Sequence, residues 1–254
     1  KLRARDALSD EEERAIRGLV AEVRDVPADR TLVSAGEELS VSILLLEGLL
    51  CRYKDLRDGS RQISELHVAG DFVDLHGFTL KRLDHSVMAL TQARIALVPH
   101  DRLKALTEEF PHLTRLYWFM TNLDAAIHRE WVLSLGRRSA LARVAHLFCE
   151  LQVKLGIVGL ADESGYALGL TQADAARLIE LLRATAPEHR PASVHLSGCP
   201  KRCASRGPDE VVLVAGPRPG SVASRALERR RARSRRPTRV KPAFAKCPSQ
   251  YLPV

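Results

Sequence analysis

The sequence lacks the long apolar run that a membrane-spanning helix requires. No 18 consecutive residues are apolar, whereas a helix needs about 20 such residues to cross a bilayer. The charged stretch 1–30 also lacks the apolar core of a secretory signal. We therefore expect a cytoplasmic protein with no membrane partner.

Cysteine is scarce and unevenly placed. The five cysteines stand at positions 51, 149, 199, 203 and 247. An odd count with irregular spacing, in a chain long enough to bury a core, argues against the disulfide framework of a small secreted protein. Reduced thiols are expected instead.

Acidic residues are nearly missing from the C-terminal part. Residues 217–254 hold eleven Lys and Arg but a single acid, Glu228, whereas residues 1–216 have a net charge of −2. The formal net charge of +8 therefore arises in the tail. Such a tail attracts polyanions without reading their sequence, and its unpatterned composition predicts disorder over 217–254.

Regularly spaced glycines predict a region of short strands. Glycines at 36, 48, 59 and 70 are separated by 12, 11 and 11 residues, with apolar and β-branched stretches between them. We expect an antiparallel β-roll over about 30–100 and a helix before it over Asp10–Val23, with Ser9 and Glu12 as a capping box. The expected strands are Ser42–Leu46, Leu49–Tyr53, Gln62–His67, Ser86–Leu90 and Ala93–Val98.

A long helix is expected from Pro111, because apolar residues follow it at intervals of three and four. This stripe is narrow enough for pairing with a second copy of the helix, although it is also compatible with packing on the β-roll. We assign it to pairing. Its members are Leu113, Leu116, Met120, Leu123, Ile127 and Trp131.

Further elements are expected after this helix. Gly136 should end the long helix, and a second one is expected over Ser139–Leu155. A loop or small hairpin over 156–170 should precede a helix over Gln172–Ala184 that Thr171 caps. Short strands are then expected at Ser193–Leu196 and Glu210–Ala215.

The order of these elements resembles that of the Crp/Fnr family of bacterial transcription regulators. The resemblance covers about 10–175. The segments that carry it are Gly48-Leu49-Leu50-Cys51-Arg52-Tyr53, Asp58-Gly59-Ser60-Arg61-Gln62-Ile63, Gly70-Asp71-Phe72-Val73-Asp74-Leu75, Ala142-Arg143-Val144-Ala145-His146-Leu147 and Leu170-Thr171-Gln172-Ala173-Asp174.

The resemblance implies a homodimer in which a signal bound at the β-roll reorients paired DNA-reading helices. The candidate effector-pocket residues are Gly70, Asp71, Asp74, His85 and Ser86. Cyclic AMP is not expected, because His85 stands where members that bind it have an arginine for the cyclic phosphate. An iron–sulfur sensor of the Fnr type is not expected either, since no cysteine cluster stands near the start of the sequence.

Four histidines in the expected roll raise the alternative of metal or haem ligation. They are His67, His76, His85 and His100. Their scattered positions favour separate loop histidines.

The DNA-reading part looks incomplete. Thr171 and Gln172 open a helix-turn-helix of the family type, but prolines at 187 and 191 follow where a recognition helix should stand. We therefore expect DNA binding that is sensitive to salt and has no sequence specificity.

A second resemblance begins where the first one ends. Ser197-Gly198-Cys199-Pro200-Lys201-Arg202-Cys203 resembles the sirohaem and [4Fe–4S] motif of nitrite and sulfite reductases, with precorrin-3B synthase as the nearest likeness over about 178–216. By this resemblance Cys199 and Cys203 would ligate a cluster. Only two of four ligands are present, and about 40 residues are too few for the enzyme's domains, so no enzymatic activity is expected.

The sequence thus predicts an α+β protein with five parts: a cyclic-nucleotide-binding-like β-roll (1–110), a dimerisation helix (111–135), an incomplete winged helix-turn-helix (136–177), a small αβ reductase-like fragment (178–216) and a disordered basic tail (217–254). We interpret it as a Crp/Fnr-type regulator. The alternatives are an iron–sulfur or sirohaem redox protein and the product of a chimeric or frameshifted gene.

Overall fold

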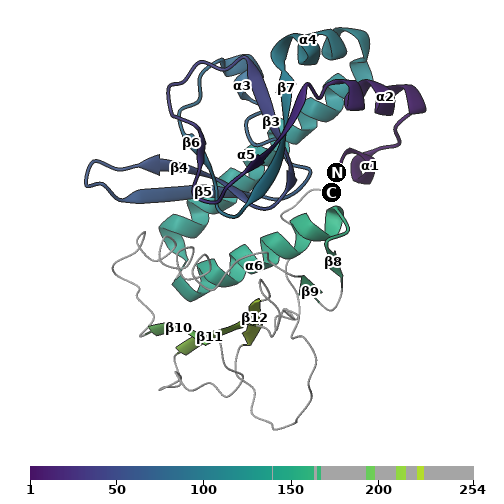
Figure 1. Cartoon of the computed structure of the whole chain (residues 1–254). Helices are drawn as coiled ribbons and strands as arrows, with labels where there is room; N and C mark the ends of the chain where they lie inside the picture. Colours follow the sequence, from purple (N-terminus) through teal and green to yellow (C-terminus); the bar gives the residue numbers. More distant parts are fainter. Residues whose placement is uncertain (139, 163–164, 167–192, 198–209, 216–221, 226–254) are drawn as a thin grey trace. The chain divides into compact units, whose positions relative to one another are not determined.

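The computed structural model describes residues 1–138, 140–162, 165–166, 193–197, 210–215 and 222–225. The chain divides into two compact units, one holding residues 1–132 and the other beginning at Leu133. Figure 1 labels the elements.

The first unit is built on a β-roll of two antiparallel sheets. One sheet has the order β2-β6-β4-β5, from Thr31–Val33, Ser86–Ala89, Leu50–Asp55 and Arg61–His67. The other has the order β1-β7-β3, from Glu22–Val26, Ala93–Pro99 and Val41–Glu47. Apolar side chains from both sheets form one buried core that includes Leu45, Leu50 and Ile95.

The five strands expected from the sequence are confirmed, with ends that shift by one or two residues. The two strands β1 and β2 were not expected. Gly48 explains the tight turn between β3 and β4, because its φ is +89° and a Cβ there would lie 2.4 Å from the carbonyl oxygen of Gln92. Any other residue would clash with that backbone.

The N-terminal segment holds two helices, α1 (Leu2–Arg5) and α2 (Asp10–Gly18). Ser9 and Glu12 form the expected capping box at the start of α2. The expected helical end at Val23 is wrong, because α2 stops at Gly18 and the chain enters β1 at Glu22. Glu22 and Val23 instead pair with β7. Their backbone hydrogen bonds to β7 would be lost if α2 continued to Val23.

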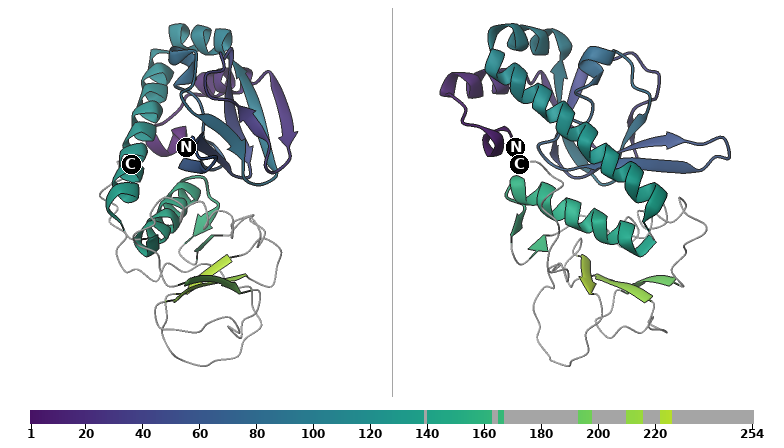
Figure 2. Two further views of the ribbon diagram at one scale, coloured as in Figure 1. Left: turned by 90° about the vertical axis from the view of Figure 1, so that its left-hand side faces the viewer. Right: turned by 180° about the vertical axis from the view of Figure 1, so that it is seen from behind.

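The short helix α3 (Gly77–Leu80) lies between β5 and β6 in the sequence. Two further helices follow the last strand of the roll. Helix α4 covers His100–Glu109, which the sequence did not predict, and α5 covers Pro111–Arg137. The expected break at Gly136 is wrong, because α5 runs through it. Figure 2 shows α5 running along one side of the roll.

Part of the apolar stripe assigned to pairing packs inside its own unit. Leu113 and Leu116 are buried in a core formed with residues of α2, α4 and β7, and Met120 packs against the same core. Ile127 and Trp131 are also buried, and Leu123 is partly buried. A side chain buried in its own unit cannot contact a second copy, so the packing alternative holds for Leu113 and Leu116.

Tyr117 contributes a buried hydroxyl to this core. Its ring contacts that of Phe72 edge to face, with centroids 5.9 Å apart, and no residue that the structure describes hydrogen-bonds to its Oη. Burial raises the pKa of this phenol. The polar atom therefore bears a desolvation cost without a compensating bond.

Substitution of Tyr117 by phenylalanine should raise the free energy of unfolding by about 1 kcal/mol. Urea denaturation followed by circular dichroism measures the change. Tyr53→Phe is the matched control, because Tyr53 is also buried but its Oη lies 3.0 Å from Thr31 Oγ1. The free energy of unfolding of that control should fall by about 1 kcal/mol. If the free energy of unfolding changes in the same direction in both variants, the explanation is contradicted.

In the second unit, the helix expected at Ser139–Leu155 is observed as α6 (Ala140–Ile157). The hairpin expected after it consists of β8 (Ala161–Asp162) and β9 (Gly165–Tyr166). The expected helix at 172–184 lies outside the described residues. No helix among the described residues is both long and apolar enough to cross a membrane.

The last described segments form a small sheet of their own. β10 (Ser193–Ser197) pairs in parallel with β11 (Glu210–Ala215), close to the bounds expected for both strands. β12 (Val222–Arg225) pairs antiparallel with β11. The expectation of disorder throughout 217–254 is therefore wrong at 222–225, where ladder hydrogen bonds order the backbone; the rest of this tail lies outside the described residues.

Candidate effector site

A β-bulge directs Arg52 into the interior of the roll. Arg52 on β4 pairs with Glu65 on β5, while the next residue, Tyr53, pairs with Ile63. Ser64 is therefore the extra residue, and such a bulge re-aims the side chains beside it. Arg52 and Glu65 are both buried as a result.

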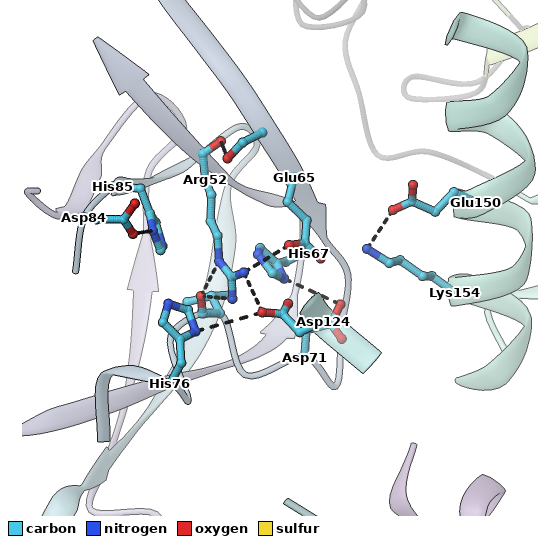
Figure 3. A network of polar contacts seen from close by, with 12 residues as sticks. Arg52, Glu65, His67, Asp71, His76, Asp84, His85, Asp124, Glu150 and Lys154 are labelled. Carbon is cyan, nitrogen blue, oxygen red and sulfur yellow. Dashed lines mark hydrogen bonds and ion pairs between the residues drawn. The ribbon is translucent and has the colours of Figure 1, made fainter. Parts of the chain in front are cut away.

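The guanidinium of Arg52 links four segments of the chain (Figure 3). Its Nε and Nη2 donate to the carbonyl oxygen of Val73 at 2.8 and 2.7 Å. Its Nη1 donates to Glu65 Oε2 at 3.0 Å and to Asp124 Oδ2 on α5 at 2.7 Å. The roll and α5 thus share one buried cation.

Glu65, His67 and Asp124 together have the composition of a metal site, with ligand atoms that all lie within 4.8 Å of one another. Arg52 already supplies a cation to both carboxylates of this group. Burial alone would lower the pKa of Arg52, but Asp124 and Glu65 raise it. A second cation beside a charged guanidinium would be repelled.

Asp74 lies at the same end of the interior and is fully buried. Its Oδ1 accepts a hydrogen bond from the amide of Ile43 at 2.7 Å, and no described residue hydrogen-bonds to its Oδ2. Burial raises the pKa of Asp74 to about 7, against the opposing effects of the Ile43 amide and Arg52. This carboxyl is therefore partly protonated near neutral pH.

His85 is held by an acidic neighbour. Its Nδ1 lies 2.9 Å from Asp84 Oδ1, and Asp84 in turn pairs with Lys54 at 2.8 Å. Lys54 and His85 lower the pKa of Asp84 well below its usual range. Burial lowers the pKa of His85 despite the opposing effect of Asp84, so the imidazole is largely neutral.

His76 lies beside His85, with the ring centroids 5.3 Å apart. Its Nδ1 is 3.9 Å from Asp124 Oδ2. Burial lowers the pKa of His76 to about 4, with a further contribution from Arg52. His76 is therefore a second neutral imidazole at the junction between the roll and α5.

The expected pocket residues divide into two groups. Gly70 and Asp71 form a turn, in which Asp71 Oδ2 accepts from the amide of Val68 at 2.9 Å. Ser86 Oγ accepts from the amide of Ala35 at 3.0 Å. Asp71 and Ser86 thus accept from backbone amides, and Asp71 also pairs with Lys1 Nζ. Asp74 and His85 instead lie close enough to Arg52 for its positive charge to lower their pKa values.

This interior is poorly suited to a cyclic phosphate. The guanidinium of Arg52 is saturated by two carboxylates and a carbonyl. The surrounding acids would repel an anion.

Sequence reasoning missed Arg52, Glu65 and Asp124 as site residues and treated His76 as an isolated loop histidine. The only available signal was charge on a residue of an apolar strand, as at Arg52 in Leu50-Cys51-Arg52-Tyr53. Asp124 stands on α5, far from Arg52 in the sequence, but pairs with it. Pairing across 72 residues cannot be read from local spacing.

Other expected site residues lie elsewhere. Cys51 is buried in β4. His100 is separate from the pair of histidines above and contacts Ser42 Oγ through Nε2 at 3.1 Å. Thr171, Gln172, Cys199 and Cys203 lie outside the described residues, so the DNA-reading motif, the [4Fe–4S] cluster and the sirohaem remain predictions.

Comparison with known proteins agrees with the geometry of the roll. Residues 23–110 match the family model of the cyclic nucleotide-binding domain. A probable transcriptional activator of Rhizobium leguminosarum bv. viciae is 34% identical over 126 residues, which cover 49% of this chain and 51% of that protein. The transcriptional activator protein FnrL of Cereibacter sphaeroides is 27% identical over 184 residues, 70% of this chain and 73% of the relative.

Solved structures show the same fold. The structure of FixK2 from Bradyrhizobium japonicum superposes with a TM-score of 0.55 at 24% identity, covering 66% of this chain and 83% of that one. The c-di-GMP responsive regulator CLP of Xanthomonas campestris gives a TM-score of 0.53 at 13% identity, covering 70% of this chain and 89% of that one. The match to the Rhizobium activator spans only about half of that protein, 51% of its length.

The two sequence relatives are named as transcriptional activators, and the three motifs over 48–75 that resembled the Crp/Fnr family fall within the matched region 23–110. The reductase-like resemblance is not among these matches. Residues 23–110 thus form a domain of the cyclic nucleotide-binding type, and regulators of the Crp/Fnr family are homologues of this chain.

Proposed function

We propose that this chain is a Crp/Fnr-type transcription regulator that senses an effector at the β-roll and acts as a homodimer. The observation that carries the proposal is the buried contact of Arg52 with both Glu65 and Asp124. It joins the sensing roll directly to α5, the helix that such regulators use for pairing.

This contact gives a physical route for signalling within the first unit. Asp124 lies two turns before the end of that unit's part of α5, and its carboxylate is held at 2.7 Å by a buried guanidinium. A ligand that competes for Arg52 or Asp124 would change how firmly α5 is held on the roll. An effector can shift an equilibrium only through such differential contacts.

DNA is the proposed partner, and the Arg-rich segment 217–254, with eleven Lys and Arg against one acid, is the source of the net positive charge. With the recognition helix missing from the sequence pattern after Gln172, we expect binding through phosphates rather than base edges. Affinity should then fall steeply as salt increases, because each neutralised phosphate releases counterions.

Selection from a pool of random duplexes tests this expectation. Wild-type protein should bind duplex DNA at about 50 mM salt, lose at least about 100-fold in affinity by about 200 mM, and enrich no sequence. Replacing Arg229, Arg230 and Arg231 by serine should reduce the slope of log affinity against log salt by about 0.9 for each phosphate that the variant no longer neutralises.

The outcomes separate the parts of the proposal. An enriched site with two-fold symmetry would show that residues after Gln172 form a complete DNA reader, and would correct the expectation of non-specific binding. Failure to bind duplex DNA even at low salt would contradict the regulatory function itself.

A further inference from the structure

A histidine at the start of α5 bridges two carboxylates of the N-terminal segment. His112 is the second residue of α5, and Figure 2 shows α1 and α2 beside the start of that helix. Its Nδ1 lies 2.6 Å from Oε1 of Glu12 on α2, and its Nε2 lies 3.4 Å from Oδ2 of Asp6, the residue that follows α1. One imidazole thus connects α5 to acids that precede it by 100 and 106 residues.

The two contacts together require a charged ring. A carboxylate only accepts hydrogen bonds, so a ring nitrogen must carry a proton in order to bond to it. The neutral imidazole has one N–H group, whereas the imidazolium ion has two. In the neutral ring of His112, the lone pair of one nitrogen would therefore face a carboxylate. The complete bridge exists only in the protonated state.

Glu12 is already held in position by its own helix. Its Oε2 accepts from the amide of Ser9 at 2.8 Å as part of the capping box, and its side chain is 12% exposed. A fixed carboxylate loses less conformational freedom on pairing than a mobile surface partner does. The amide of Ser9 and then His112 lower the pKa of Glu12.

Asp6 is the more exposed of the two acids. The amide of Ala7 and then His112 lower its pKa, and Arg5 on α1 adds to the effect. Both carboxylates are therefore ionised in the range where a histidine titrates. The charge of the bridge changes only when the ring gains or loses its proton.

Other charged groups near the bridge pair with one another or are screened. Arg3 of α1 pairs with Glu13 of α2. Glu109, which ends α4, and Arg115, one turn along α5, are exposed and opposite in sign, so solvent and salt weaken their effects on the ring. The hydrogen bond to Glu12 raises the pKa of His112, while desolvation opposes the rise and the contact with Asp6 adds to it.

We propose that His112 is a pH-dependent clasp, which fastens the N-terminal segment 1–18 to the start of α5 when the ring is protonated and loosens that segment when the ring is neutral. Leu8 and Ile16 of this segment pack against the core that contains Leu113. The clasp therefore controls how firmly an apolar side of α5 is covered. This device does not depend on the binding of DNA.

The direction of the pH dependence follows from the raised pKa of His112 in the folded chain. The stabilisation by the clasp is fully present below the ordinary pKa of histidine, and it is lost as the pH rises through the raised pKa. The equilibrium constant for opening the segment should increase about tenfold for each unit by which the folded pKa exceeds that of the open segment.

Hydrogen exchange of the full chain tests the clasp. The exchange of the amides of α1 and α2, corrected for the intrinsic effect of pH, should become faster between about pH 5 and about pH 8. NMR of the same protein with labelled histidines measures the pKa of His112, whose signal is the one missing from His112→Gln. Asp6→Asn and Glu12→Gln should each lower that pKa, and Glu12→Gln more strongly, although glutamine preserves the capping box.

Two variants isolate the contribution of the ring. His112→Gln keeps an N–H donor but does not titrate, so it should remove most of the pH dependence of exchange in α1 and α2. His128→Gln, at another half-buried histidine of α5, is the matched control and should retain it. Asp74 inside the roll also titrates in this range, with a pKa of about 7, but its effect is common to both variants.

Two results would overturn the proposal. One is a measured pKa of His112 at or below the ordinary value of a histidine. The other is exchange in α1 and α2 whose pH dependence is as large in His112→Gln as in the wild-type protein.

Discussion

Replacing Arg52 by methionine is expected to lower the free energy of unfolding by about 3–5 kcal/mol. Methionine keeps the length and apolar stem of the side chain but removes its charge. The buried carboxylate of Glu65 then loses the guanidinium that faces it at 3.0 Å. Leaving one charge of a buried pair in place costs more than the pair itself contributes, because the remaining charge stays desolvated.

Urea denaturation at one protein concentration measures this change, because association would otherwise alter the apparent stability. Arg52→Lys is expected to lose less, since it keeps the charge but not the planar fork that reaches Val73, Glu65 and Asp124 together.

The double variant Arg52→Met with Glu65→Leu is the decisive control for the Arg52 prediction. It replaces the buried pair by apolar groups and should recover most of the lost stability. Asp124 is partly exposed and can regain hydration. If the double variant is no more stable than Arg52→Met, desolvation of Glu65 is not the cause of the loss.

The substitution Ala125→Glu is expected to convert a dimer of this protein into a monomer. The exposed side of α5 is a narrow stripe at intervals of three and four, formed by Arg115, Trp118, Asn122, Ala125, Arg129 and Val132. Trp118 is 68% and Val132 60% exposed, and these two flank Ala125 at seven-residue intervals. A seven-residue apolar repeat is the pattern of paired helices.

Light scattering coupled to size-exclusion chromatography measures the change in mass. Ala125→Glu should give the mass of one chain, because the new charge would be desolvated at the centre of the pairing face. Ala105→Glu is the matched control, since it places the same charge on an exposed alanine of α4. That variant should remain a dimer.

The same measurement distinguishes the two faces of α5. Leu116→Asp, on the stripe first assigned to pairing, should unfold the first unit rather than release folded monomers, because Leu116 lies in its core. If Leu116→Asp gives folded monomers while Ala125→Glu remains a dimer, the stripe that contains Leu116 is the pairing face.

Much of the first unit could be predicted from the sequence. The glycines at 36, 48, 59 and 70 all adopt positive φ, which explains why they separate the strands of the roll. Alternation and β-branched residues located five of its seven strands. These signals are local, since a turn or a strand leaves its mark on neighbouring residues.

The candidate site could be predicted only in part. Asp74 and His85 were chosen from a resemblance to the phosphate-binding segment of the family. They do lie near the interior cation, but the cation is Arg52 and its principal partners are Glu65 and Asp124. Charged residues inside the roll leave no periodic pattern in the sequence. Their partners depend on the bulge at Ser64 and on the packing of α5 against the roll.

The sequence by itself determined five strands of the roll, the turns at its glycines and the helical period of α5. Only the tertiary structure decided which face of α5 is buried, because the helix has apolar residues on two sides and periodicity does not say which partner each side meets. The core that contains Leu113 and Leu116 fills one side, and Trp118, Ala125 and Val132 are exposed on another side, where we expect the proposed pairing with a second copy. The same docking brings Asp124 to Arg52 and His76, because burying the apolar side of the helix carries the carboxylate into the roll.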